Sequence, residues 1–175
     1  MTEPGYTLFE TAIGICAIAW GEGGVIGAQL PEGDASRARA RLARRFPDAR
    51  EMAPPPAVAQ AIDEIVALIA GEPRDLHSIR LDMAGVPDFH RKVYAVARAI
   101  LPGETLTYGE VAKRIGEPGA SQAVGQALGK NPFPIIIPCH RVLAAGGKTG
   151  GFSANGGVVT KLKMLQIEGA AVNHT

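Results

Sequence analysis

A cysteine and a histidine stand side by side at Cys139 and His140, directly after a proline and the run Ile135–Ile137, which predicts a buried strand that ends at Cys139. A thiol of ordinary pKa is mostly protonated at neutral pH, so a nucleophilic Cys139 needs a base and a third group that orients this base. Neighbouring side chains on an extended chain point to opposite sides, so a water is one way to link His140 to the sulfur. Glu168 is a candidate for the orienting group. A structural role for the pair stays open on these residues alone.

A metal site has little support in this sequence. Two thiols make a poor zinc site, and the histidines show neither C-x-x-C nor H-x-x-x-H spacing. A disulfide between such distant cysteines is not expected in a cytosolic chain. We therefore expect no metal and no cofactor. The residues concerned are Cys16, Cys139, His77, His90, His140 and His174.

The composition is that of a globular protein with a packed core, since 46% of the 175 residues are hydrophobic. No apolar run approaches the roughly 20 residues that cross a bilayer, and the acidic N-terminus is unlike a secretory signal. These features predict a cytoplasmic protein without membrane contact. Residues 1–86 carry 8 Lys/Arg against 12 Asp/Glu, whereas residues 87–175 carry 10 against 5. The basic half holds Cys139 and fits a phosphate backbone, although an ordinary solvated surface explains so small an excess equally well.

The first half of the chain predicts a small sheet with helices. Two apolar runs around a glycine-rich turn, at 11–30, are typical of a hairpin. Residues 34–46 predict a helix with Asp34 or Ser36 as N-cap, and residues 56–71 predict a second helix that Gly71 ends. Alternation over 75–83 favours a third strand. A connection near residue 86 then leads to a helix capped by Asp88, so we expect one domain at 1–86 and another at 87–175.

Two short helices, at 105–116 and 120–132, predict a helix-turn-helix. The first has Thr105 or Thr107 as its cap, and the turn between them contains glycine. The outer residues of the second helix are small or uncharged, as a helix that enters a DNA groove requires. A tightly packed helix pair without DNA explains these small residues nearly as well.

The Cys139 region closely resembles the active-site segment of the O6-alkylguanine-DNA alkyltransferases. The resemblance covers about residues 80–170 and is carried by "NPFPIIIPCHRVLAAGGKTGGFSANGG" and "TKLKMLQIEG". It implies an α/β (α+β) fold with a small N-terminal sheet and a mainly helical C-terminal domain that holds the helix-turn-helix. It also implies that an alkyl group passes once from O6-alkylguanine, or O4-alkylthymine, to the protein. No cofactor is needed, the partner is double-stranded DNA, and a monomer is expected.

The same resemblance assigns roles to individual residues. Cys139 is the acceptor thiol, His140 the water-mediated base, and Glu168 the carboxylate that polarises His140. Asn131 links the recognition helix to the site, and Tyr108 presses on the target phosphate and donates to the purine. The remaining assignments are Val142, Phe152 and Ser153 for the substrate and Ser121, Gln122 and Ala123 for DNA. The basic residues Lys113, Arg114, Lys130 and Arg141 are further candidates, for phosphate contacts that offset the cost of base extrusion.

Two departures from the family pattern bear on base flipping and on the pocket. Gln122 replaces the arginine that fills the hole left by the flipped base, and glutamine is shorter and uncharged. Weaker flipping is therefore expected. The substrate loop at 150–157 is two residues longer than usual and has Phe152 where many members have tyrosine, which affects the range of alkyl groups accepted.

Three other functions compete with alkyl transfer. An alkyltransferase-like sensor binds the lesion without accepting the group, but such proteins lack the cysteine. A helix-turn-helix regulator has no need of Asn131 or Glu168. A thiol hydrolase would need a separate base and an oxyanion site that the sequence does not show.

Overall fold

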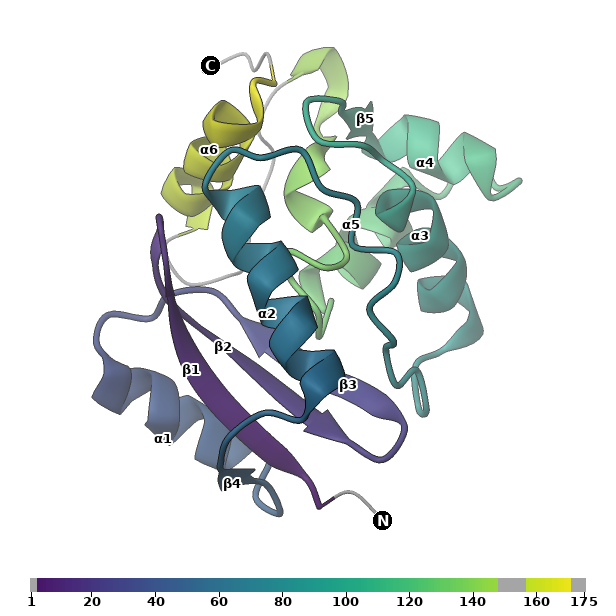
Figure 1. Ribbon diagram of the computed structural model, residues 1–175. Coiled ribbons are helices and arrows are strands. Elements are labelled where there is room, and N and C mark those ends of the chain that lie inside the picture. The colour runs from purple at the N-terminus through teal and green to yellow at the C-terminus, as the bar shows by residue number, and fades with distance from the viewer. Residues whose placement is uncertain (1–2, 148–156, 171–175) are drawn as a thin grey trace.

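The computed structural model describes residues 3–147 and 157–170 and has a four-stranded sheet followed by a cluster of helices (Figure 1). This arrangement confirms the predicted α+β fold. Among the described residues, no helix is both long and apolar enough to span a membrane. The elements are β1 (Gly5–Thr11), β2 (Gly14–Gly21), β3 (Gly24–Gln29), α1 (Ala35–Arg45), β4 (Arg50–Glu51), α2 (Pro56–Ile69), α3 (Asp88–Arg98), β5 (Leu106–Thr107), α4 (Tyr108–Arg114), α5 (Ser121–Gly129), η1 (Cys139–Arg141), β6 (Val142–Leu143), η2 (Ala145–Gly147) and α6 (Gly157–Glu168).

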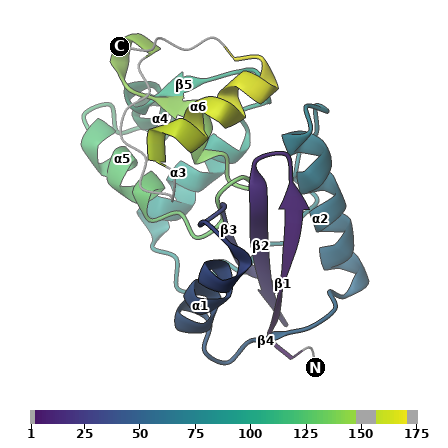
Figure 2. The same ribbon diagram turned by 90° about the vertical axis from the view of Figure 1, so that its left-hand side faces the viewer.

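The central strand β2 is buried on both faces. The sheet has the order β3-β2-β1-β4, and α1 and α2 lie on its opposite faces (Figures 1 and 2). Cys16, Ile18 and Trp20 alternate with two alanines along β2, and all five are at most 1% exposed. Because the side chains of a strand alternate between faces, the large residues fill one side and the alanines allow α1 to approach the other.

The predicted hairpin at 11–30 is confirmed, since β2 and β3 pair antiparallel around the glycine-rich turn. The preceding strand β1 was not predicted. It pairs with β2 over its whole length, and Gly14 takes a φ of 124° where the chain turns between them. Asp34, not Ser36, caps α1, because its side chain accepts a hydrogen bond from the backbone N–H of Arg37.

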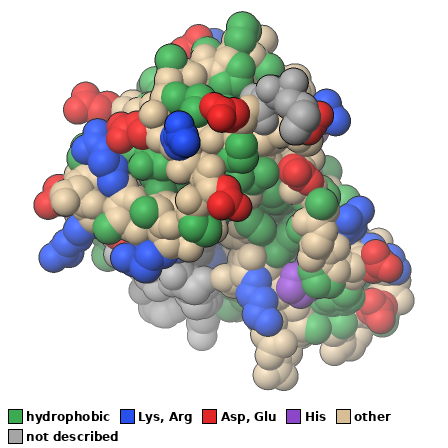
Figure 3. Space-filling view, turned by 90° about the horizontal axis from the view of Figure 1, so that it is seen from below, with side chains coloured by type: hydrophobic (Ala, Val, Ile, Leu, Met, Phe, Trp, Pro, Cys, Tyr) green, Lys and Arg blue, Asp and Glu red, His purple; other side chains and the backbone are tan. Residues whose placement is uncertain are grey.

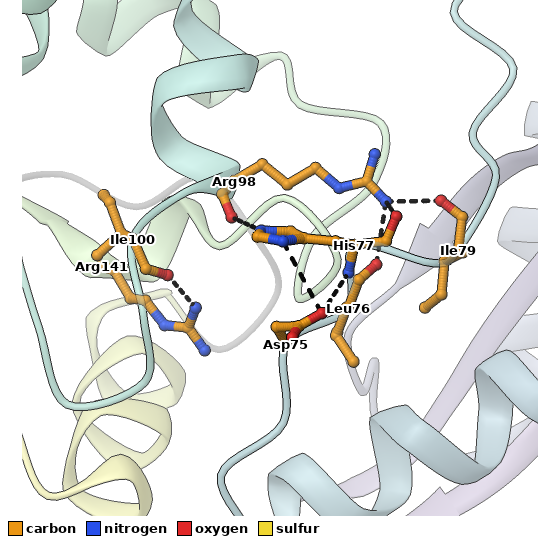
Figure 4. A network of polar contacts seen from close by, with 7 residues as sticks. All are labelled: Asp75, Leu76, His77, Ile79, Arg98, Ile100 and Arg141. Carbon is orange, nitrogen blue, oxygen red and sulfur yellow. Dashed lines mark hydrogen bonds and ion pairs between the residues drawn. The ribbon is translucent and has the colours of Figure 1, made fainter.

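The predicted third strand at 75–83 is wrong. Within the part of the chain that the structure describes, its pairing with the sheet is limited to an isolated bridge between Leu81 and Val25. Arg98 of α3 instead donates to the carbonyls of Leu76 and Ile79, as Figure 4 shows. Arg98 thus satisfies carbonyls of this segment, and only Arg80 and Asp82 bond to β3 among the described residues, through the backbone of Val25.

The helices of the second half begin close to the predicted positions. Asp88 is the first residue of α3 and not its cap, which is Pro87. Thr107 caps α4 and forms a capping box with Glu110. Helices α4 and α5 contact each other and α3, and the hydroxyl of Tyr94 on α3 donates to the carbonyl of Ala127 on α5. The predicted helix pair therefore packs on α3 as one unit.

The three isoleucines before Cys139 are buried but do not form the predicted strand. Ile135 has a φ of 79°, which is rare for a β-branched residue, and Pro134 makes an isolated bridge to Ile137. The side chain of Asn131 donates to the carbonyl of Ile137 and accepts from the N–H of Phe133. These bonds fold the segment into a compact turn that delivers Cys139 to the start of η1.

Candidate active site

The thiol of Cys139 lies nearly buried at the first position of η1, with 8% of the residue exposed. Burial raises the pKa of this thiol, and a hydrogen bond from Asn131 and the positive charge of Lys161 act in the opposite direction. The burial effect is the largest, so the resting form is the protonated thiol. A reaction at this sulfur therefore requires a group that removes its proton.

His140 and Arg141 share one carboxylate, that of Glu168 at the end of α6. The Nε2 of His140 lies 3.0 Å from Oε2, and Arg141 donates to both carboxylate oxygens at 2.9 and 2.7 Å. The side chains of all three residues are at most 5% exposed. Burial alone would raise the pKa of Glu168, but the hydrogen bonds from Arg141 and His140 outweigh it and lower this pKa to about 2. The carboxylate is therefore ionised throughout the physiological pH range.

The ionised carboxylate fixes the tautomer of His140. An ionised carboxylate only accepts hydrogen bonds, so Nε2 of the neutral imidazole must carry the proton that lies against Glu168. Burial lowers the pKa of His140, which keeps the ring neutral. Its Nδ1 is buried and has no hydrogen-bond partner among the described residues. The ring therefore presents one unprotonated nitrogen that can accept a proton.

Arg141 does not serve the role predicted from the sequence. It is 4% exposed, and besides Glu168 it donates to the carbonyl of Ile100 at 2.6 Å (Figure 4). A guanidinium held on the inside of the protein by a carboxylate and a carbonyl cannot also neutralise a DNA phosphate. The prediction of a DNA contact is wrong, and Arg141 instead stabilises the charge of Glu168.

Lys161 is a buried residue of the site that the sequence reasoning missed. It is 0% exposed, and its Nζ donates to the carbonyl of Val142 at 2.9 Å. Burial lowers its pKa to about 8, so it remains mostly charged at neutral pH. A signal was present in the sequence, because Lys161 precedes Met164 and Glu168 by three and seven residues. That spacing places all three side chains on one face of α6.

Tyr108 and Val142 lie beside Lys161. The ring centroid of Tyr108, the first residue of α4, is 5.9 Å from the Nζ of Lys161. Burial raises the pKa of this phenol, and a negative charge on an ionised Cys139 acts in the same direction. The phenol is therefore a proton donor at neutral pH. Val142 is fully buried in β6, which pairs with β5 directly before Tyr108.

Apart from Arg141, the residues predicted to contact DNA lie on the helix pair or directly after it. Five of these residues are exposed and one is half-buried. Phe152 and Ser153, which were predicted to contact the substrate, lie outside the described residues. Gln122 is the second residue of α5, and Lys113 and Arg114 occupy the last turn of α4. The exposed residues are Lys113, Arg114, Ser121, Gln122 and Lys130, and the half-buried one is Ala123.

Comparisons with known proteins agree on one family. Residues 88–170 match the 6-O-methylguanine DNA methyltransferase, DNA binding domain. The chain is 35% identical over 155 residues to the methylated-DNA–protein-cysteine methyltransferase of Methanothermobacter thermautotrophicus, covering 89% of this chain and 80% of the relative. It is 44% identical over 114 residues to the protein of that name from Mycobacterium tuberculosis, covering 65% and 67%. The crystal structure of Mycobacterium tuberculosis OGT in complex with DNA is similar, with a TM-score of 0.73 and 36% identity over 94% of this chain and 92% of that one. The chain therefore belongs to the methylated-DNA–protein-cysteine methyltransferase family.

Proposed function

We propose that this protein repairs DNA by taking the alkyl group of O6-alkylguanine onto the sulfur of Cys139. The observation that carries the proposal is a nearly buried thiol next to a histidine whose tautomer is fixed by an ionised carboxylate. The relatives are methyltransferases by name, and one solved relative is bound to DNA. Such a protein is a methylated-DNA-[protein]-cysteine S-methyltransferase that acts once.

The site residues remove a proton from the Cys139 thiol and supply a proton to the departing purine. The thiol proton passes to Nδ1 of His140 through a water, and Glu168 stabilises the imidazolium that forms. The sulfur then attacks the alkyl carbon, the carbon–oxygen bond breaks, and the oxygen and its electron pair remain with guanine. Tyr108 donates a proton to the departing purine and recovers one from His140 by way of solvent. The products are a thioether and an unmodified guanine, so atoms and charge balance.

The charge of Lys161 opposes the burial cost of a thiolate at Cys139. Its pKa of about 8 keeps this charge in place at neutral pH. A buried cation near a sulfur lowers the free energy of the ionised form, which is the reactive one. We infer that Lys161 and the hydrogen bond from Asn131 together make a thiolate accessible in a site that would otherwise exclude it.

The helix pair is the proposed DNA surface. The target base must leave the stack to reach the thiol of Cys139, a residue that is 8% exposed, and extrusion costs about a few kcal/mol. Phosphate contacts from Lys113, Arg114 and Lys130 offset this cost, while the start of α5 enters the groove. We also propose that the protein acts as a cytoplasmic monomer and that the domain boundary lies near residue 86.

Intact-mass spectrometry after incubation with a duplex that contains O6-methylguanine tests the proposed function. We expect one methyl group per protein molecule, located by peptide mapping on the Cys139 peptide, and no further gain with excess DNA. Burial raises the pKa of the other thiol, Cys16, to about 11, so it should remain unmodified. Tight binding of the lesion without a change of mass would instead identify a sensor, and modification of Cys16 would contradict the assignment of the acceptor.

Gln122→Arg is expected to speed transfer from duplex DNA about tenfold. A longer, charged side chain at the second position of α5 can fill the vacated stack and donate charge-assisted hydrogen bonds, each worth about 1.5 to 3 kcal/mol before ordering costs. Transfer from free O6-benzylguanine needs no flipping and should change less than about twofold. The two rate constants, compared in one single-turnover experiment, isolate the flipping step.

Two outcomes would contradict this role for Gln122. Equal changes on both substrates would show that residue 122 acts on the pocket or on the fold. A slower duplex reaction would show that glutamine is itself fitted to the way this protein holds DNA. Gln126→Arg, one helical turn further along the exposed side of α5, is the matched control for added charge.

A further inference from the structure

The N-terminal sheet is hydrogen-bonded to the active-site turn through the carbonyl of Pro132. The backbone N–H of Ala28 donates to this oxygen at 2.9 Å, and Nη2 of Arg45 donates to it at 3.3 Å. Ala28 lies on β3, an edge strand of the sheet, and Arg45 is the last residue of α1. Figure 2 shows β3 on the side of the sheet that faces the C-terminal helices. A strand edge and a helix end from the first half of the chain therefore converge on residue 132.

Arg45 is held in place by several groups. Its Nη1 donates to the carbonyl of Ala28 at 2.9 Å and to Oε1 of Gln29 at 3.2 Å. Its guanidinium lies 4.7 Å from the ring centroid of Phe46, a distance typical of a cation–π contact. Residue 27 must be small here, since a Cβ on Gly27 would come within 2.4 Å of the Phe46 ring. Burial lowers the pKa of Arg45 to about 10, so it stays charged at neutral pH.

Other arginines of α1 lie in a different environment. Arg39 and Arg41 form ion pairs with Glu51 and Glu32 at the surface. Figure 3 shows Lys and Arg side chains interspersed with Asp and Glu on the face seen from below. Surface ion pairs of this kind contribute little to stability. Arg45 is therefore distinguished by its direct contact with the active-site turn.

Pro132 stands inside the turn that Asn131 organises. The amide of Asn131 bridges Pro132, because its Oδ1 accepts from the N–H of Phe133 on the far side at 2.9 Å. Its Nδ2 donates to the carbonyl of Ile137, two residues before Cys139. The peptide unit that Arg45 holds is thus part of the ring of bonds that orients the Asn131 amide. A displacement of the Pro132 carbonyl would move this amide relative to the sulfur.

We propose that Arg45 is a positioning residue for the Cys139 site, acting through the carbonyl of Pro132 and the side chain of Asn131. The N-terminal sheet and α1 thereby form part of the reactive machinery, because they hold the turn that orients the thiol. The inference rests on the proposed function only in taking Cys139 as the acceptor. Asn131 favours the ionised form of the thiol, so loss of Arg45 should make Cys139 harder to ionise.

Arg45→Gln tests this role through the reactivity of Cys139 as a function of pH. Alkylation of the Cys139 peptide by iodoacetamide, followed by mass spectrometry, needs neither DNA nor the proposed function. We expect the midpoint of this pH profile to move to higher pH. Single-turnover transfer from O6-benzylguanine should slow about tenfold, the scale of one lost charge-assisted hydrogen bond, with less than a twofold change in DNA affinity. Arg45→Lys keeps the charge but not the two donor groups of a guanidinium. Its pH midpoint and its transfer rate should lie between those of the wild-type protein and Arg45→Gln.

Arg39→Gln is the matched control, since it removes one arginine and an ion pair from the same helix without touching Pro132. It should leave the profile and the rate unchanged. Asn131→Ala provides the second test, because Arg45→Gln should cost almost nothing further in that background if Arg45 acts through Asn131. Additive losses, or a lower Tm with an unchanged pH profile, would overturn the proposal. A failure of the proposed function would look different, with no alkyl transfer by the unmodified protein and the iodoacetamide profile still displaced.

Discussion

Cys139→Ser should bind alkylated duplex DNA as tightly as the wild-type protein and fail to accept the alkyl group. A serine hydroxyl is a far weaker nucleophile at neutral pH, and His140 is placed to remove a proton from a thiol. Loss of the nucleophile from a covalent mechanism lowers the rate by a factor on the order of 10⁴ or more. The proposed DNA surface on α4 and α5 does not include residue 139, so affinity should change less than about twofold. Single-turnover transfer and titration of a labelled duplex measure the two quantities separately.

Cys16→Ser is the matched control for this experiment. Cys16 is 1% exposed in the middle of β2, and its sulfur lies 3.7 Å from the hydroxyl of Thr11. Its replacement should lower stability modestly, because a hydroxyl is less apolar than a thiol, and should leave transfer intact. If DNA binding disappeared together with the Cys139 thiol, the separation of binding surface and reactive site proposed above would be wrong.

The helices were predictable because their signals are local. Apolar spacing and a capping side chain fixed α1 and α4 to within a few residues, and Gly71 takes a φ of 103° just after α2, where a helix end was expected. Strand β1 was missed because only partial burial marks it, and its partner β2 supplies the hydrogen bonds. The bounds of helices therefore follow from local sequence, whereas strands depend on partners elsewhere in the chain.

The errors in the second half have a common physical cause. An apolar run such as Ile135–Ile137 satisfies the composition of a buried strand, yet the amide of Asn131 takes the backbone bonds that a strand would use. Arg141 has the residue type of a phosphate contact, but its environment is a buried carboxylate. A sequence pattern gives the type of a side chain and its helical face. The pattern does not identify a distant partner such as Glu168, which lies 27 residues from Arg141 in the chain.

The candidate site was foreseen in its residues more than in its geometry. The family resemblance predicted that Glu168 acts on His140, and the structure places Nε2 of His140 3.0 Å from a carboxylate oxygen of Glu168. The spacing of Lys161 places it on the same face of α6 as Glu168, but the carbonyl contacts of Lys161 and Arg45 were not foreseen, because each joins a side chain to a distant segment. Every residue has a backbone carbonyl, so the type of a residue does not indicate whether its carbonyl accepts such a hydrogen bond.

Glu168→Gln should destabilise the protein by about 3 to 5 kcal/mol. The substitution preserves the shape of the side chain but removes the charge that both Arg141 and His140 contact, and a buried cation without its partner is costly. Transfer should also slow about tenfold or more, because an adjacent carboxylate raises the pKa of a histidine base and glutamine does not. Urea unfolding and single-turnover kinetics at the same pH measure the two effects.

In the wild-type protein, the ion pairs of Glu168 should also make the free energy of unfolding depend on pH in acid. The folded-state pKa of Glu168, about 2, lies below the ordinary value of 4.5. A carboxyl group with a depressed pKa adds stability that is fully present above its unfolded pKa and is lost as the pH falls through the folded value. Glu168 alone should therefore remove about 3 kcal/mol of unfolding free energy between about pH 4.5 and pH 2. Glu168→Gln should lack this loss, so the two stability curves should converge as the pH falls.

Glu51→Gln provides the comparison that separates a buried carboxylate from an exposed one. Glu51 also pairs with an arginine through both oxygens, at 2.9 and 3.1 Å, but its side chain is 42% exposed. Its loss should lower stability far less than the loss of Glu168, since solvent screens a surface pair. If Glu168→Gln and Glu51→Gln lowered stability equally, burial would not be what gives the Glu168 network its strength. The tautomer assigned to His140 would then lose its physical basis, because it depends on a carboxylate that stays ionised inside the protein.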